Sequence, residues 1–261
     1  MKNPFNVRKI ADNTYIIEQK TKYFQCLTYL LLGREKALLI DTGVNEGDLK
    51  GTVDTLTNLP VIVVCTHGHL DHIGCAWQFG GALICEADDK LLENHLNQAY
   101  LKSLMKLEYS PLFCFFYKRP INRLTTPPPV TLWGHLPETI DLGERTIEVI
   151  NTPGHTPGSV CFLDRKNRML FSGDTICDWG ILLHLEGTGI ETYLQSIKKI
   201  KAIENDFDDI WPGHHGAPVK RGTLDSYIAC AEGVISGDIE PVRHKRKQIA
   251  TYEGILITLK P

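Results

Sequence analysis

The sequence predicts a single α+β domain, spanning residues 1–261, in which two β-sheets carry helices on their outer faces. Two blocks of short strand-like runs, each with a helical stretch, predict the two sheets. A segment of different composition separates the blocks. With 261 residues, 43% of them hydrophobic, the chain is long enough to bury a substantial core.

The first block lies in the N-terminal quarter of the chain. Runs rich in apolar and β-branched residues, bounded by turn residues, predict strands at 14–18, 26–32, 36–41 and 61–65. A helix is expected near 46–57, before the last of these strands. This order of elements predicts that a helix covers one face of the first sheet.

The second block begins after Pro137. Strand-like runs are found at 146–151, 159–164, 168–174 and 208–211. Residues 191–204 place apolar side chains at helical spacing and are expected to form an amphipathic helix. The chain ends in another strand-like run, GILITL.

The segment near 88–137 is predicted to be a cap-like insertion. Residues 88–107 are typical of a helix, and five aromatics follow within 109–120. Dense aromatics of this kind are most often core, but they also mark interaction sites. We expect Phe115 and Phe116 to contact substrate, and a dimer interface is the competing explanation.

Charge and termini narrow the function classes. The net charge of -3 gives no general attraction to nucleic acid or to an anionic membrane, and the basic run at 243–247 is interpreted as a solvated surface. The N-terminus lacks an apolar signal core and no apolar run is long enough to span a bilayer, so a cytoplasmic protein is expected. The eight cysteines lack CxxC spacing, which favours free thiols in a reducing compartment.

The motif THGHLDH carries the strongest chemical signal. It places His67, His69, Asp71 and His72 directly after an apolar strand-like run. A lone histidine is usually a structural residue, but imidazoles and a carboxylate packed this densely would be costly to bury without a cation. The motif therefore predicts a metal site.

Three more candidate ligands follow later strand-like runs. His155 lies in NTPGHTPGS, Asp174 in LFSGDT and His214 in DIWPGHH, each beside glycine or proline. If these strand ends converge on one sheet edge, the loops bring five histidines and two aspartates together. That number of ligands is enough for two metal ions.

These motifs, in this order and after the segment LLIDTG, resemble the metallo-β-lactamase superfamily over residues 14–217. The resemblance implies an αββα sandwich of two mixed sheets flanked by helices. It also implies that His67, His69 and His155 hold a first ion, that Asp71, His72 and His214 hold a second, and that Asp174 bridges them.

Three further residues receive roles from this resemblance and from their positions. Asp41 is expected to orient a ligand histidine, as carboxylates commonly do at metal sites, although it could be an ordinary turn residue. The family pattern selects His214 over His215, whose role stays open. Cys177 is expected to be packed rather than catalytic.

Two zinc ions suit a site of imidazole and carboxylate, with iron as the alternative. Zinc lowers the pKa of its bound water to about 7, which supplies a metal-bridging hydroxide as the nucleophile at neutral pH. Asp71 is expected to orient that hydroxide or relay a proton, and is the candidate catalytic residue.

Within the superfamily the sequence is most similar to glyoxalase II, because GDT is followed at some distance by EGT at 186–188. It departs from that branch in two ways. The segment DWGILLHLEGT is mainly apolar where a basic residue is typical, and the 47 residues after His214 are not expected to form the long helical C-terminal domain of that branch. We therefore expect hydrolysis of an ester, thioester, lactone or amide whose apolar portion contacts the insertion, Trp179 and His184.

Three other function classes were compared with the sequence. Persulfide dioxygenases resemble glyoxalase II but use a single iron ion. A nuclease or phosphodiesterase would need a larger basic surface than residues 243–247 offer. A non-catalytic binding module should lack ligands, whereas all seven are present. The expected partner is a small-molecule substrate, with no nucleic acid or membrane, and with a homodimer left open.

Overall fold

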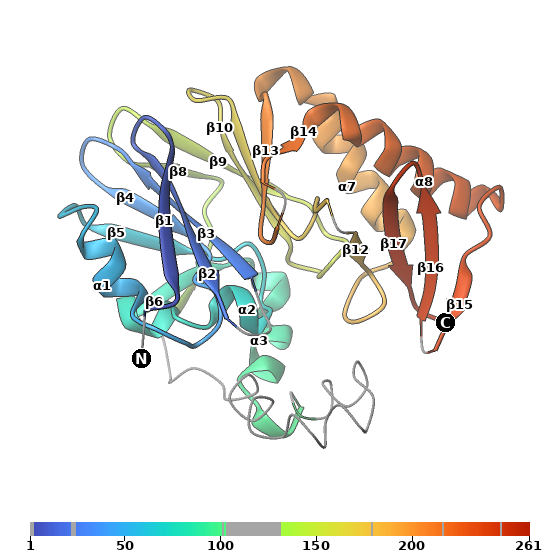
Figure 1. Ribbon diagram of the computed structural model, residues 1–261, viewed down its shortest axis with the longest axis horizontal. Coiled ribbons are helices and arrows are strands. Elements are labelled where there is room, and N and C mark those ends of the chain that lie inside the picture. The colour runs from blue at the N-terminus through green and yellow to red at the C-terminus, as the bar shows by residue number, and fades with distance from the viewer. Residues whose placement is uncertain are drawn as a thin grey trace.

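The computed structural model describes residues 3–21, 25–100, 102, 132–178, 180–215, 217–245 and 247–261. Two sheets lie face to face, with helices outside them and a third, smaller sheet at the C-terminal end (Figure 1). The predicted arrangement of two mixed sheets flanked by helices is confirmed. The aromatic run at 109–120 lies outside the described residues.

The first sheet has seven strands in chain order. They are β1 (Phe5–Ala11), β2 (Thr14–Lys20), β3 (Gln25–Leu32), β4 (Ala37–Ile40), β5 (Val61–Val64), β6 (Gly81–Ile84) and β7 (Leu132–His135). The strands from β1 to β4 pair antiparallel, and those from β4 to β7 pair parallel. β5, which precedes the THGHLDH motif, is therefore an interior strand.

The second sheet has the order β14-β13-β11-β10-β9-β8. Its strands are β8 (Thr139–Asp141), β9 (Thr146–Asn151), β10 (Val160–Asp164), β11 (Met169–Gly173), β13 (Asp209–Pro212) and β14 (Val219–Lys220). Both β9 and β11 run antiparallel to β10, and β13 runs parallel to β11. The carboxyl ends of β9, β11 and β13 consequently meet at one edge of the sheet.

The third sheet was not predicted. It has the order β12 (Ile181–Leu182), β17 (Ile255–Leu259), β16 (Lys247–Tyr252) and β15 (Val242–His244). It packs against α8 (Leu224–Ser236), which lies beside α7 (Ile190–Ala202) (Figure 1). β12 pairs with the C-terminal strand β17 and so ties the end of the chain to the segment that follows Asp174.

Three apolar clusters hold these layers together. The middle cluster joins the inner faces of the two large sheets, where the rings of Tyr29 and Phe171 lie 4.9 Å apart. The other clusters lie between the first sheet and its helices and between the second sheet, α7, α8 and the third sheet. Every residue of β10 and β11 is buried, which explains their continuous apolar sequences.

The helices of the first half are short. They are α1 (Leu49–Asp54), α2 (Leu70–Ile73) and α3 (Asp89–His95), with 3₁₀ turns at Ala76–Phe79 and Glu86–Asp88. Two further 3₁₀ turns, Glu204–Asp206 and Arg221–Thr223, lie in the second half of the chain. α1 is shorter than the predicted helix near 46–57 because Gly47 has a φ of 91° and Asp48 caps the first turn by accepting a hydrogen bond from the Gly51 amide at 2.8 Å. No helix among the described residues is long and apolar enough to cross a membrane.

Each cysteine of the described residues is free, and all of them except Cys85 are buried.

Candidate metal centre

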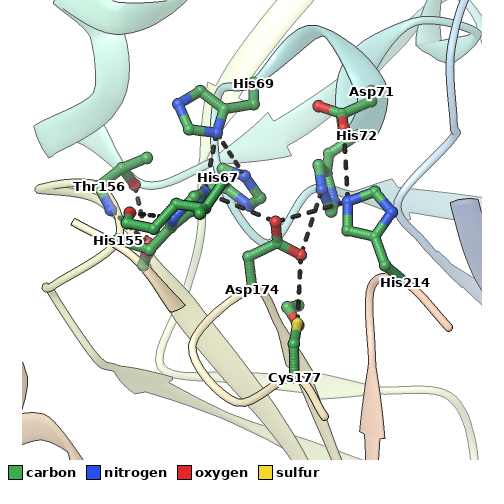
Figure 2. A network of polar contacts seen from close by, with 12 residues as sticks. His67, His69, Asp71, His72, His155, Thr156, Asp174, Cys177 and His214 are labelled. Atoms are coloured by element: carbon green, nitrogen blue, oxygen red, sulfur yellow. Dashed lines mark hydrogen bonds and ion pairs between the residues drawn. The ribbon is translucent and has the colours of Figure 1, made fainter. Parts of the chain in front are cut away.

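The predicted metal ligands lie together at one edge of the sandwich (Figure 2). The motif residues follow β5, and the later ligands follow β9, β11 and β13. Two backbone hydrogen bonds join the sheets here, from Val160 to Thr66 at 2.9 Å and from Leu27 to Gly213 at 2.8 Å. The loops therefore converge because their strands end at the same edge.

The local backbone conformation directs the side chains of these loops toward one another. His69 is the residue before the first turn of α2, so Asp71 and His72 lie on that turn. Gly173 turns the chain into Asp174 with a φ of 50°, and a Cβ there would lie 2.5 Å from the Thr66 hydroxyl oxygen. Only glycine fits both the positive φ and this close approach.

Three histidines form a first cluster. The Nε2 atom of His67 lies 3.0 Å from the Nδ1 atom of His69, and the Nε2 atom of His155 lies 2.9 Å from that same Nδ1. All three side chains are buried. Nitrogen ligands around a tetrahedral zinc ion lie about 3.4 Å apart, given Zn–N bonds of about 2.1 Å, so this spacing is close to that of a coordination site.

The opposite ring nitrogens of these histidines are bonded to acceptors. His67 Nδ1 lies 3.0 Å from the Thr66 hydroxyl, which itself donates to Asp41. His69 Nε2 lies 2.8 Å from Glu186, and His155 Nδ1 lies 2.8 Å from the Leu182 carbonyl. Because those nitrogens carry the protons, the three lone pairs face one another. Such an arrangement is favourable only with a cation between them.

Asp71 and His214 form a second cluster, and the centroid of the His72 ring lies 5.1 Å from that of His214 and 4.0 Å from that of His67. His214 Nε2 lies 3.4 Å from Asp71 Oδ2, while its Nδ1 donates to the Gln25 carbonyl at 2.8 Å. The Nε2 atom of His72 is buried and has no hydrogen-bond partner in the part of the chain that the structure describes. An unpartnered buried nitrogen beside carboxylates fits the donor set of a cation site.

Asp174 lies between the two clusters (Figure 2). Its Oδ2 atom lies 3.6 Å from His155 Nε2 and 3.4 Å from His214 Nε2, and its Oδ1 atom lies 3.5 Å from His72 Nε2. A single carboxylate thus reaches both groups of nitrogens. Imidazole and carboxylate donors in this arrangement fit divalent ions such as zinc.

The electrostatics of the two clusters differ. Burial lowers the pKa of His155 to about 4, with neighbouring His69 adding to the effect, so its ring is neutral at pH 7. Burial also disfavours charge on His72, but the carboxylates of Asp41 and Asp174 outweigh it and hold the pKa well above its ordinary value. His155 therefore offers a neutral nitrogen, and the carboxylates beside His72 provide negative charge that a cation would balance.

Asp41 contacts the site as expected for a residue that orients a ligand. Its Oδ2 atom accepts from His72 Nδ1 at 2.8 Å, and its Oδ1 atom accepts from the Thr66 amide at 2.7 Å. It holds this position with a φ of 62°, which is uncommon for aspartate. The hydrogen bond fixes the His72 tautomer with Nε2 directed at Asp174.

Three acidic or thiol groups at this site were not predicted from the sequence. Glu186 binds His69, and Asp88 binds the backbone amides of Gly68 and Gly158 at 2.9 and 2.6 Å. The Cys26 thiol lies within 4.8 Å of ligand atoms of Asp71 and His214. Of these three residues, only Glu186 lies in a segment noted from the sequence, the EGT tripeptide that resembles glyoxalase II. Nothing local distinguishes Asp88 or Cys26 from structural residues.

The predicted substrate contacts are described only in part. His184 is half-buried, and its Nδ1 lies 2.6 Å from the Thr258 hydroxyl of β17. Trp179, Phe115 and Phe116 lie outside the described residues.

The structure also describes His215 and Cys177, which lie next to predicted ligands. His215 is exposed, binds the Gln25 side chain at 2.7 Å and lines a polar pocket of about 180 Å³ with Arg8 and Glu18. The thiol of Cys177 is buried, 3.7 Å from Asp174 Oδ1.

The sequence itself matches a known family. Residues 21–214 fit the family described as the metallo-beta-lactamase superfamily. The chain belongs to the metallo-beta-lactamase superfamily. The expected enzyme class, a metal-dependent hydrolase similar to hydroxyacylglutathione hydrolases, is confirmed with it.

Superfamily relatives include two hydrolases. The acyl-coenzyme A thioesterase MBLAC2 of Bos taurus is 26% identical over 200 residues, which cover 71% of each chain. The hydroxyacylglutathione hydrolase GloC of Haemophilus influenzae is 30% identical over 200 residues, which cover 73% of this chain and 86% of GloC. The crystal structure of the DIM-1 metallo-beta-lactamase superposes with a TM-score of 0.60 over 88% of this chain and 98% of DIM-1, at 16% identity, and shows the shared fold.

Proposed function

We propose that the chain is a two-zinc hydrolase that cleaves a thioester with an apolar acyl portion. The observation that supports this proposal is the convergence of seven donor side chains, with Asp174 oxygens within 3.6 Å of the Nε2 atoms of His72, His155 and His214. In this proposal His67, His69 and His155 hold one ion, and Asp71, His72 and His214 hold the other. A bound divalent ion polarises a carbonyl and lowers the pKa of water to about 7.

Asp71 is the candidate residue for orienting the attacking water and accepting its proton. Burial would raise its pKa, but its hydrogen bond to His214 and the charge of His72 outweigh this and hold the pKa far below the ordinary value. Its side chain is 22% exposed, compared with 8% for Asp174. An ionised, accessible carboxylate is able to accept a hydrogen bond from water and orient it toward a carbonyl carbon.

A thioester is favoured within the wider group of esters, lactones and amides. The two relatives named above are a thioesterase and a hydroxyacylglutathione hydrolase, and both names describe the cleavage of an acyl–sulfur bond. Hydrolysis consumes one water and yields a carboxylic acid and a thiol. Because a thiol has a pKa near 8.5, it leaves as the thiolate without a dedicated general acid.

The test is elemental analysis followed by a substrate panel. We expect about two zinc ions per chain, and release of thiol from acyl-coenzyme A thioesters that exceeds turnover of lactones, phosphodiesters and β-lactams. His67→Ala should abolish turnover, whereas Asp54→Ala, on the exposed face of α1, should not. A single iron ion with oxygen uptake on persulfides, or a preference for phosphodiesters, would overturn the proposal.

A further inference from the structure

We propose that Glu186 is a positioning residue that fixes the tautomer of His69 and couples this ligand to α3 and Tyr100. The inference rests on the proposed function, because it assumes that His69 binds a metal ion. Glu186 follows β12 in the chain and is 117 residues from His69. It lies outside all four loops that carry the predicted ligands.

The Glu186 carboxylate accepts hydrogen bonds from three side chains. Its Oε2 atom lies 2.8 Å from His69 Nε2 and 3.1 Å from His95 Nε2. The Tyr100 hydroxyl donates to its Oε1 atom. The Glu186 side chain is only 15% exposed, so these bonds form largely away from water and are stronger than surface contacts.

The protonation pattern of this group follows from the backbone. His95 Nδ1 accepts a hydrogen bond from the Leu70 amide at 3.1 Å, so its proton lies on Nε2 and points at Glu186. His69 likewise donates from Nε2, because an ionised carboxylate only accepts. The lone pair of His69 is therefore on Nδ1, which faces His67 and His155.

His69 presents a different ring nitrogen to the centre from the other predicted ligand histidines. The ligand atoms of His67, His72, His155 and His214 are all Nε2, whereas His69 presents Nδ1. The alternative tautomer of His69 would direct an N–H group at the first cluster and block coordination. Glu186 excludes that tautomer.

The same carboxylate links the centre to the segment that begins at α3. The rings of His69 and His95 lie 5.0 Å apart, and His95 is buried at the end of α3. Tyr100 completes the contact from further along the chain. A displacement of this segment would thus move the partner of a metal ligand rather than a distant surface.

The experiment compares Glu186→Ala and Glu186→Gln with Glu191→Gln, an exposed position on α7. Loss of an outer carboxylate typically weakens metal affinity about 10- to 100-fold, and we expect this for Glu186→Ala in chelator competition with zinc. Glu186→Gln keeps the volume and one acceptor and should lose less, and Glu191→Gln should match wild type. Tyr100→Phe leaves the His69 bond in place and should change affinity by less than about threefold.

A tautomer measurement separates positioning from a general structural effect. Long-range ¹H–¹⁵N spectra of the metal-free protein should show His69 protonated on Nε2 in wild type, and a mixture of tautomers in Glu186→Ala. The visible spectrum of the cobalt-substituted protein should change in the same variant. Unchanged zinc affinity and an unchanged His69 tautomer in both Glu186 variants would overturn the inference. If wild type bound no metal, the proposed function itself would fail.

Discussion

Asp71 and Asp174 are both carboxylates of the centre, but they reach different neighbours. Asp71 Oδ2 contacts His214, whereas the Asp174 oxygens contact histidines of both clusters. Loss of a carboxylate that binds one ion should release that ion alone. Loss of a carboxylate that binds both ions should weaken both sites.

We therefore expect Asp71→Ala to lose the second ion and keep the first. Elemental analysis after gel filtration should fall from about two metal equivalents to about one, and turnover should drop at least about tenfold, the lower end of the usual effect of general acid–base groups and metal partners. Asp174→Ala should weaken both sites. The assignment is wrong if Asp71→Ala keeps both ions and near wild-type activity.

Asp88 acts on the protein backbone rather than on a ligand side chain. It is fully buried and accepts from the amides of Gly68 and Gly158 and from the Thr156 hydroxyl, at 2.9, 2.6 and 2.8 Å. It thereby joins the loop of His67 and His69 to the loop of His155.

Replacing Asp88 with Asn should destabilise the protein by about 3 kcal/mol, because the new amide group would point a donor at donors and leave one of them unsatisfied. Urea denaturation of the metal-free protein would measure this free energy of unfolding. The neighbouring Asp89→Asn is the matched control, since the Asp89 side chain is 53% exposed. Equal stability of the two variants would remove Asp88 from this role.

Among the elements, the third sheet is more than a C-terminal addition. β17 pairs with β12, and the Leu182 carbonyl of β12 accepts the hydrogen bond from His155 Nδ1. The carbonyl that accepts the hydrogen bond from His155 therefore lies on a strand that is paired with β17. Packing of β17 supports the orientation of His155.

Truncation of Ile257 on β17 should show how much this packing contributes. Ile257 is fully buried against α8 and β12, and Ile257→Ala should cost about 2–4 kcal/mol of unfolding free energy. Val242→Ala on β15 of the same sheet, where the side chain is 70% exposed, should change stability by less than about 0.5 kcal/mol. A small loss at Ile257, measured by urea denaturation, would mean that β17 is not a packed strand.

Substrate selection depends on residues that only the complete fold brings together. The segment DWGILLHLEGT contains no lysine or arginine, but the fold brings Lys260 to it from the end of the chain, with Nζ 3.2 Å from the Gly187 carbonyl. One such cation, already bonded to the backbone, should bind an anionic tripeptide weakly.

We expect lactoylglutathione to be a poorer substrate than a hydrophobic thioester of equal reactivity. The comparison of kcat/KM values decides it, with Lys260→Ala as the variant that removes the nearby cation. A preference for the glutathione thioester of about a hundredfold, or roughly 2.7 kcal/mol in transition-state binding, would contradict the expectation.

Several of the strands that the sequence predicted well are buried along most of their length. β3, β4, β10 and β11 consist mainly of apolar residues, so their pattern needs no knowledge of neighbours. β1 and β16 were missed because much of each strand is exposed and its sequence, FNVRKIA or KQIATY, is polar. Their pairing partners, not their own residues, make them strands.

The sequence by itself determined the superfamily and the set of candidate ligands. The reason is that the histidines and aspartates at the strand ends lie in short contiguous motifs. Only the tertiary structure decided which nitrogen of each histidine faces the centre. Apart from His67, whose partner Thr66 is adjacent, that choice is made by hydrogen bonds to acceptors far away in the chain, such as Glu186 for His69 and Gln25 for His214. Contacts across 117 and 189 residues leave no local pattern, since they arise only when the two sheets close on each other.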